Sequence, residues 1–180
     1  MKKLLVLMPI LLLATACGAK PADPLPPVDS EETYYSVKLT PESSLITSED
    51  TTTNYTVNLK AIEDETVFYS IEIGAPCYLS TKAHEFIMKP GSYLKSVSTE
   101  KVDRLIVDFW GGKGVNFGVY ANADGTGDAL EYHESTVQAE DPDDGGMVYE
   151  YAINGSAWCL KNITEFNKPG IYSVTVVFSK

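Results

Sequence analysis

The chain of 180 residues has little of several residue types on which common activities depend. Its two histidines, His84 and His133, lie far apart, and no H-E-x-x-H zinc pattern occurs. There is no G-x-S-x-G nucleophile motif. We therefore expect no catalytic residues, no metal and no cofactor. A hydrolase built from two facing carboxylates remains an unfavoured alternative.

Positive charge is also scarce. Lys and Arg number 14 against 25 Asp and Glu, so the net charge is −11. Proteins that bind nucleic acids gain affinity when their basic side chains displace counterions from phosphates. So acidic a chain excludes nucleic acid as a partner, and its charge favours solubility and repulsion from anionic surfaces.

No apolar run is long enough to span a bilayer, which takes about 20 residues. The run Leu4–Leu13 is shorter and contains Pro9. It follows Lys2 and Lys3 and precedes the small residues Ala14-Thr15-Ala16. This order is typical of an export signal. A buried helix of the folded domain is the alternative, and the polar, proline-rich segment that follows argues against it.

The segment Leu13-Ala14-Thr15-Ala16-Cys17 resembles the lipobox of bacterial lipoproteins, with Ala14 where that family usually has Leu. The resemblance implies that residues 1–16 are a signal peptide, cleaved before Cys17, and that the Cys17 sulfur carries a diacylglycerol. The expected partner is therefore a membrane, contacted through the lipid. The expected location is the extracytoplasmic side of a bacterial cell envelope.

Cysteine is rare, and only Cys77 and Cys159 remain beside Cys17. Outside the reducing cytosol two thiols often pair, so we expect a disulfide between them. The alternative is that the two side chains are separate small hydrophobic residues in the interior.

Residues 17–32 hold four prolines and few apolar side chains, which predicts an extended tether. Residues 33–180 are long enough for one domain. Short alternating segments rich in β-branched and aromatic residues predict strands there. The predicted strands are Tyr34–Leu39, Asn54–Lys60, Val67–Ile73, Ser92–Ser98, Arg104–Trp110, Val115–Asn122, Ala129–Val137, Met147–Asn154, Ala157–Asn162 and Ile171–Phe178.

No helical periodicity is present, so the domain is expected to be all-β, an antiparallel sandwich or barrel. Three stretches, Gly91–Ser96, Val102–Asp108 and Tyr172–Phe178, resemble jelly-roll sandwiches of the carbohydrate-binding-module and galactose-binding-like kind. That resemblance implies a jelly-roll-like β-sandwich and a glycan as ligand.

The strands 104–110 and 115–122 are joined by Gly111-Gly112-Lys113-Gly114, which predicts a hairpin. Alternation places Leu105, Val107 and Phe109 on one face of the first strand and Phe117 and Val119 on one face of the second. The opposite face then carries the candidate ligand-binding residues Asp108, Trp110, Asn116 and Tyr120, together with Asn122. Aromatic rings can stack on sugars, and carboxylates and amides can bond their hydroxyls. The alternative is that both rings pack under a loop or second sheet.

Two acidic segments suggest simpler roles. Asn122–Asp128 spaces its oxygen ligands as a calcium loop does, but His133 stands where that pattern requires Glu, so a turn is favoured. Glu140–Asp144 is expected to be a solvated loop.

Together these observations predict a membrane-anchored, non-catalytic binding domain with a glycan as the leading ligand. A structural or adhesive surface protein that binds another protein is the second hypothesis.

Overall fold

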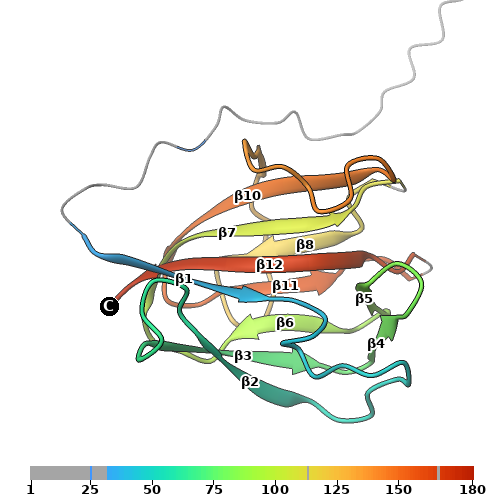
Figure 1. Ribbon diagram of the computed structural model, residues 1–180, viewed down its shortest axis with the longest axis horizontal. Coiled ribbons are helices and arrows are strands. Elements are labelled where there is room, and N and C mark those ends of the chain that lie inside the picture. The colour runs from blue at the N-terminus through green and yellow to red at the C-terminus, as the bar shows by residue number, and fades with distance from the viewer. Residues whose placement is uncertain (1–24, 26–31, 113, 166) are drawn as a thin grey trace, which may run out of the picture.

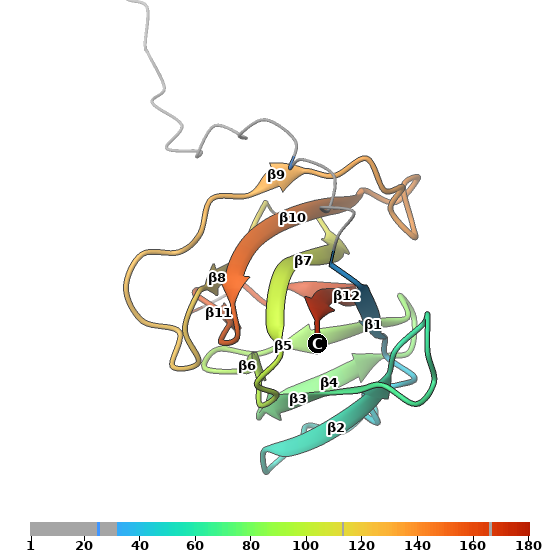
Figure 2. The same ribbon diagram turned by 90° about the vertical axis from the view of Figure 1, so that its left-hand side faces the viewer.

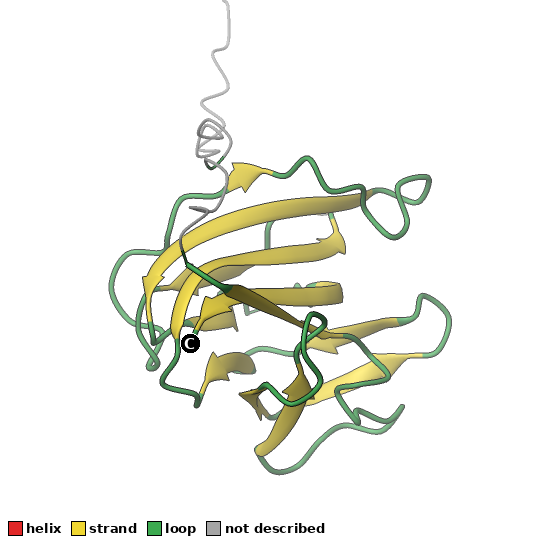
Figure 3. Ribbon diagram, turned by 60° about the vertical axis from the view of Figure 1, so that its left-hand side comes forward, coloured by secondary structure: helices red, strands yellow, loops and turns green. Residues whose placement is uncertain are grey.

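A computed structural model of the protein describes residues 25, 32–112, 114–165 and 167–180. Within these residues the chain forms twelve strands and no helix (Figures 1 and 3). The predicted signal peptide, Cys17 and all of the tether except Leu25 and Glu32 lie outside the described residues.

The strands form two antiparallel sheets that pack face to face, which confirms the predicted all-β sandwich. The first sheet has the order β4-β5-β12-β7-β10-β9, and β1 also pairs with β12. Its strands are β1 Tyr34–Leu39, β4 Cys77–Ser80, β5 Glu85–Met88, β7 Lys101–Trp110, β9 His133–Glu134, β10 Gly146–Gly155 and β12 Gly170–Ser179. The second sheet has the order β2-β3-β6-β11-β8. Its strands are β2 Tyr55–Lys60, β3 Phe68–Gly74, β6 Tyr93–Ser96, β8 Phe117–Tyr120 and β11 Cys159–Asn162.

From β5 onward the chain passes back and forth between the sheets, as expected for a jelly-roll-like sandwich. Across the core, aromatic rings of β12 and β3 are in contact, and those of β7 and β10 contact Phe117 of β8. Figure 2 looks along the sandwich, with β10 and β7 on one side and β2 and β3 on the other. Tyr34 pairs with Ser179, so the chain enters and leaves the domain at the same end.

Alternation along the strands builds the core, as predicted. In β12 the side chains of Val174, Val176 and Phe178 are fully buried between the sheets, whereas Thr175 and Val177 are partly exposed. The Phe178 ring packs on that of Tyr69 from the opposite sheet. Burial of such alternating apolar faces is the main force that holds two sheets together.

Two predictions about strands were wrong. The strands β4 and β5 were missed, because each has only four residues and neither alternates cleanly. The long strand predicted at 129–137 is reduced to the two residues of β9, and the rest of that segment is loop. The chain here crosses from β8 in the second sheet to β9 in the first, so Asn122–Asp128 does not close a hairpin.

The predicted disulfide is also wrong, since Cys77 and Cys159 are both free and buried. Cys77 belongs to the core between the sheets. Cys159 on β11 lies directly opposite Lys95 on β6 and Tyr120 on β8. Residues directly opposite each other in a sheet point to the same side of it. Cys159 therefore lies on the outer face of the second sheet. Burial raises the pKa of each thiol to about 11.

This arrangement predicts slow thiol chemistry in the folded state, because thiolates are the reactive form. In the mature chain with Cys17→Ser, native protein should react with an iodoacetamide reagent far more slowly than protein unfolded in urea. The unfolded protein should then gain two labels per chain by mass spectrometry. A chain that takes no label when unfolded without reductant would contain the disulfide.

A buried hydrogen bond joins Trp158, next to β11, to Tyr69 on β3 of the same sheet, and both side chains are fully buried. The Trp158 Nε1–H group donates to the Tyr69 hydroxyl at 3.0 Å. Loss of the acceptor leaves a buried donor unsatisfied, which costs about 1–3 kcal/mol.

We therefore expect Tyr69→Phe to lower the free energy of unfolding by about 1–3 kcal/mol in urea titrations. Tyr35→Phe is the matched control, since Tyr35 also packs on the Phe178 ring but is only partly buried. That control should change the free energy by no more than about 0.5 kcal/mol. Equal effects of the two variants would contradict the role of the Trp158–Tyr69 bond.

Candidate ligand-binding site

The predicted ligand-binding face is divided between the two sheets. Asp108 and Trp110 lie on β7 in the first sheet, whereas Tyr120 lies on β8 in the second. The predicted hairpin between these strands is wrong, because the segment after Trp110 carries the chain across to the other sheet. The four predicted residues therefore do not form one surface.

The alternation within each strand was nevertheless predicted correctly. Leu105, Val107, Phe109, Phe117 and Val119 are all buried in the core. The residues between them point to the outer faces of their sheets, as expected. The error concerned which strands pair and what covers the outer faces.

Tyr120 is covered on the outer face of the second sheet and is only 8% exposed. The Lys161 ammonium lies 5.1 Å from the centre of its ring. The ring also lies over Gly118, where a Cβ would overlap it. Tyr120 thus fulfils the alternative in which the ring packs under its neighbours.

Asn116 and Asn122 belong to loops that flank β8. The Asn116 side chain donates to the Gly114 carbonyl at 3.1 Å and accepts from Asn167 at 3.2 Å. Asn122 donates to the Thr126 carbonyl at 2.8 Å. Their amides stabilise loop conformations and lie apart from Trp110 in the fold.

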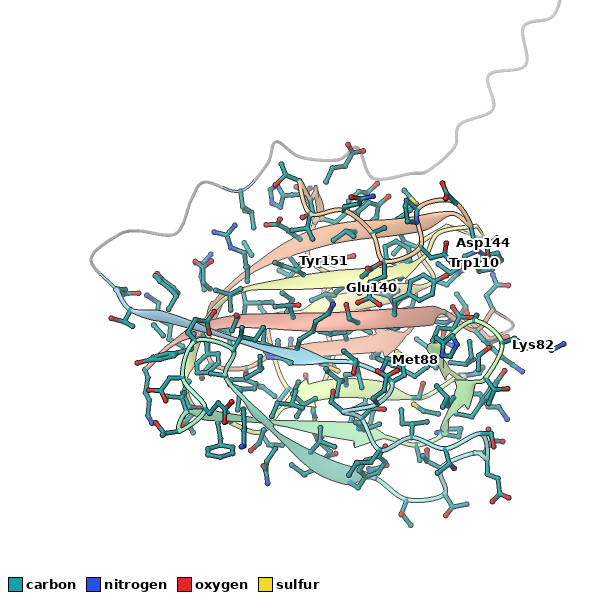
Figure 4. All side chains as sticks on the ribbon, in the orientation of Figure 1. Lys82, Met88, Trp110, Glu140, Asp144 and Tyr151 are labelled. Atoms are coloured by element: carbon teal, nitrogen blue, oxygen red, sulfur yellow. The ribbon has the colours of Figure 1, made fainter. Side chains whose placement is uncertain are left out.

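Asp108 and Trp110 remain together on the outer face of the first sheet, next to a pocket of about 220 Å³. The pocket is lined by Ala83, Glu85, Trp110, Asp144 and Tyr172. Figure 4 shows Trp110 and Asp144 at the same end of the molecule, opposite the end at which β1 begins. We call this the Trp110 pocket.

An irregularity in β12 brings Tyr172 into this pocket. Ile171 pairs with Phe109 and Ser173 pairs with Asp108, so Tyr172 is an extra residue in the register. Such a bulge re-aims a side chain. Regular alternation would place Tyr172 on the core face with Val174, and the bulge instead turns it outward.

The acidic loop before β10 holds Trp110 in place. The indole Nε1–H of Trp110 donates to the Asp144 carbonyl at 2.9 Å. The next residue, Gly111, donates its backbone N–H to the Gly145 carbonyl, also at 2.9 Å. Although most of segment 140–144 is exposed, as predicted, it forms one wall of the pocket.

The pocket carries carboxylates with spare hydrogen-bonding capacity. Glu85 Oε2 is buried and has no hydrogen-bond partner among the described residues. Burial raises the pKa of Glu85, and the negative charge of Asp144 raises it further. The carboxylate rests over Gly170, where a Cβ would overlap it. Glu85 thus presents a carboxyl group to the pocket while its Oε2 is packed against Gly170.

The same charges act on Tyr172. Burial raises the pKa of its phenol to about 12, and Glu85 and three aspartates add to the effect. Tyr172 therefore stays a neutral donor and acceptor at ordinary pH. The pocket thus combines two aromatic rings with carboxylate acceptors and lacks a cationic side chain among its lining residues.

Asp108 lies beside the pocket under the loop that contains Glu140, and is only 5% exposed. Its Oδ2 accepts the Glu140 backbone N–H at 2.7 Å, while its Oδ1 has no partner among the described residues. Burial raises the pKa of Asp108 to about 6. The N–H of Glu140 and the charge of Lys38 oppose this shift.

Neither Glu85 nor Tyr172 was a candidate in the sequence. Glu85 lies in the missed strand β5, and Tyr172 is displaced by a bulge that no short motif announces. The pairing of β5 with the start of β12, where Glu85 packs against Gly170, brings these two residues together.

Within the described residues, no three or more His, Cys, Asp and Glu side chains are arranged to hold a metal ion. The same residues contain no helix long and apolar enough to cross a membrane. In the Asn122–Asp128 loop, the Thr126 hydroxyl donates to Asp124 Oδ1 at 2.8 Å, so this carboxylate stabilises its own turn.

No family model, curated protein or solved structure matches the chain.

The raised pKa of Asp108 predicts a pH dependence of stability. Between the pKa of about 3.8 in the unfolded chain and about 6 in the folded protein, the folded state binds the extra proton. Asp108 therefore makes the free energy of unfolding fall as pH rises through this window. Asp108→Asn, which keeps an acceptor for Glu140, should remove that part of the decline.

Urea titrations at pH 4 and pH 7.5 test this prediction. The variant should gain stability relative to the original chain at the higher pH. Thr175→Ser, a change at a neighbouring outward residue of β12, is the control and should leave the pH dependence unchanged. A pH dependence identical in the Asp108→Asn variant would contradict the assignment.

Proposed function

We propose that this protein is a non-catalytic binding protein of the bacterial cell envelope, which holds a glycan at the Trp110 pocket. A lipid on Cys17 would attach it to the membrane, as the resemblance of the first 17 residues to lipoprotein signals implies. The observation that carries the proposal is the meeting of two aromatic rings with the Glu85 carboxylate in one pocket.

The chemistry of these side chains suits a sugar ring. The partly exposed indole of Trp110 offers an apolar surface for the C–H face of a pyranose. The Glu85 carboxylate would accept a hydrogen bond from a hydroxyl, and the neutral Tyr172 phenol can donate or accept one. Such a set of a few placed polar groups on aromatic walls is common in small-molecule sites.

The volume and rigidity of the pocket support the same interpretation. About 220 Å³ lies below the range of about 300–1,000 Å³ for drug-sized ligands, so one sugar unit of a longer chain fits better. The Trp110 ring is held by its own hydrogen bond to Asp144, so binding need not order it. A preorganised site loses less entropy when it binds.

Charge restricts the ligand further. The pocket is lined by Glu85 and Asp144, and the chain without its signal segment has a net charge of −13, since two lysines are removed. Glycans rich in carboxylates or sulfates would be repelled. Neutral or amino sugars are therefore the proposed class.

A second candidate function, binding to another protein, is favoured by a different surface. Ile62, Phe68 and Val97 are large apolar side chains that are 65, 49 and 44% exposed. Phe68 begins β3, and the Val97 N–H donates to Ser70 two residues along that strand. Exposed apolar groups that gather at one end of a sheet are typical of protein interfaces.

A glycan array probed with residues 17–180 carrying Cys17→Ser tests the proposed function. Neutral or amino-sugar glycans should bind, and Trp110→Ala should weaken the strongest of these interactions at least tenfold. Glu85→Gln, which keeps the shape but loses the charge, should weaken them less. Phe68→Ala removes an exposed aromatic ring elsewhere and should bind as the original chain does.

Absence of binding to any glycan, or undiminished binding by Trp110→Ala, would overturn the proposal. Shortened glycans released during incubation would instead identify a hydrolase. A urea titration of the Trp110→Ala variant checks that it still folds. Trp110→Phe, which keeps an aromatic ring, should retain part of the affinity for the glycan.

A further inference from the structure

A second cavity lies at the edge of the sandwich where β8 and β10 border the space between the sheets. Its volume is about 510 Å³, more than twice that of the Trp110 pocket, and the two share no lining residue. It is lined by Gly114, Val115, Phe117, Gly118, Val119, Ala129, Leu130, Tyr132, Tyr149, Tyr151 and Ile163. Tyr151, which is labelled in Figure 4, is the lining residue at the middle of β10.

Every described side chain around this cavity is uncharged. Aliphatic groups and the Phe117 ring make most of the wall, and the phenol groups of three tyrosines are its polar side-chain atoms. Burial raises the pKa of Tyr149 to about 12 and that of Tyr151 further, so neither ionises at ordinary pH. An ion entering this cavity would lose its hydration without a partner, which is costly.

Aromatic rings form one side of the cavity. The rings of Tyr132 and Tyr149 are stacked, with centres 4.1 Å apart and planes 7° from parallel. Tyr149 also meets Phe109 edge-on, and Phe117 meets Phe109 in the same way. A further planar ring, such as that of a ligand, gains a favourable stacking energy when it packs against such a pair.

The cavity opens to solvent, since Ala129 and Ile163 among its lining residues are exposed. A small molecule can therefore enter it without unfolding of the sandwich. Here the described lining residues come from four separate segments, 114–119, 129–132, 149–151 and 163, all built into or beside strands. The volume falls within the range of about 300–1,000 Å³ that ligand sites occupy.

We propose that this cavity is a second binding site, which takes a planar, uncharged and largely apolar small molecule with one hydrogen-bonding group for the tyrosine phenols. It is independent of the proposed glycan site. The two sites differ in charge, in lining chemistry and in the strands that form them.

The experiment uses two fluorescent probes of nearly the same shape. N-phenyl-1-naphthylamine is neutral, and 8-anilino-1-naphthalenesulfonate is the same ring system with a sulfonate. Titration of residues 17–180 carrying Cys17→Ser should show saturable enhancement of the neutral probe with one site per chain. The sulfonated probe should bind at least tenfold more weakly.

Ala129 and Ala121 provide a matched pair of variants. Both are exposed residues of the segment between β8 and β9, but only Ala129 lines the cavity. Ala129→Trp should fill its mouth and reduce affinity for the neutral probe at least tenfold, whereas Ala121→Trp should leave it unchanged. Trp110→Ala should also leave it unchanged, which separates this site from the glycan site.

Equal binding of both probes, or equal loss in the two tryptophan variants, would overturn the proposal. Absence of a saturable signal from the neutral probe would do the same. Unchanged urea titrations of Ala129→Trp show that any loss of affinity reflects a filled cavity and not a damaged fold.

Discussion

The pairing of β12 with three other strands holds the first sheet together. β7 runs along one side of β12, while β1 and β5 share the other side. The inward side chains of β12 form the centre of the core, and its Phe178 ring contacts the opposite sheet. β12 follows all three of these partners in the sequence. The irregularity at Tyr172 also brings an aromatic ring into the wall of the Trp110 pocket.

Local patterns in the sequence predicted most strands and the inward-facing side chains of the two strands analysed for alternation. Tyr34–Leu39 was predicted with the bounds that the structure gives, and the alternation of Leu105, Val107 and Phe109 identified core residues. These predictions succeed because burial on one face of a strand imposes a period of two residues. The strands β4 and β5 do not display that period, since β5 buries Phe86, Ile87 and Met88 in succession.

The partners of each strand could not be read from the same patterns. In a sandwich whose chain alternates between sheets, neighbours in sequence are seldom neighbours in a sheet. The glycines after Trp110 permit a hairpin as readily as a crossover, so the predicted surface joined residues that face away from each other. The same limit applies to Cys77 and Cys159, because both are buried but in different environments. Only Asp108 and Trp110 remained together, since they lie two residues apart on one strand.

Tyr34 and Ser179, where the domain begins and ends, lie at the opposite end of the first sheet from the Trp110 pocket. Tyr34 lies opposite Ser179, which in turn pairs with Lys101 at the start of β7, and Trp110 lies at the far end of that ten-residue strand. Such a strand is roughly 33 Å long. In a protein held to a bilayer through the residues before Glu32, as we propose, the lipid would be at one pole and the Trp110 pocket near the other. The domain would then present its aromatic pocket outward, toward whatever polymer surrounds the cell.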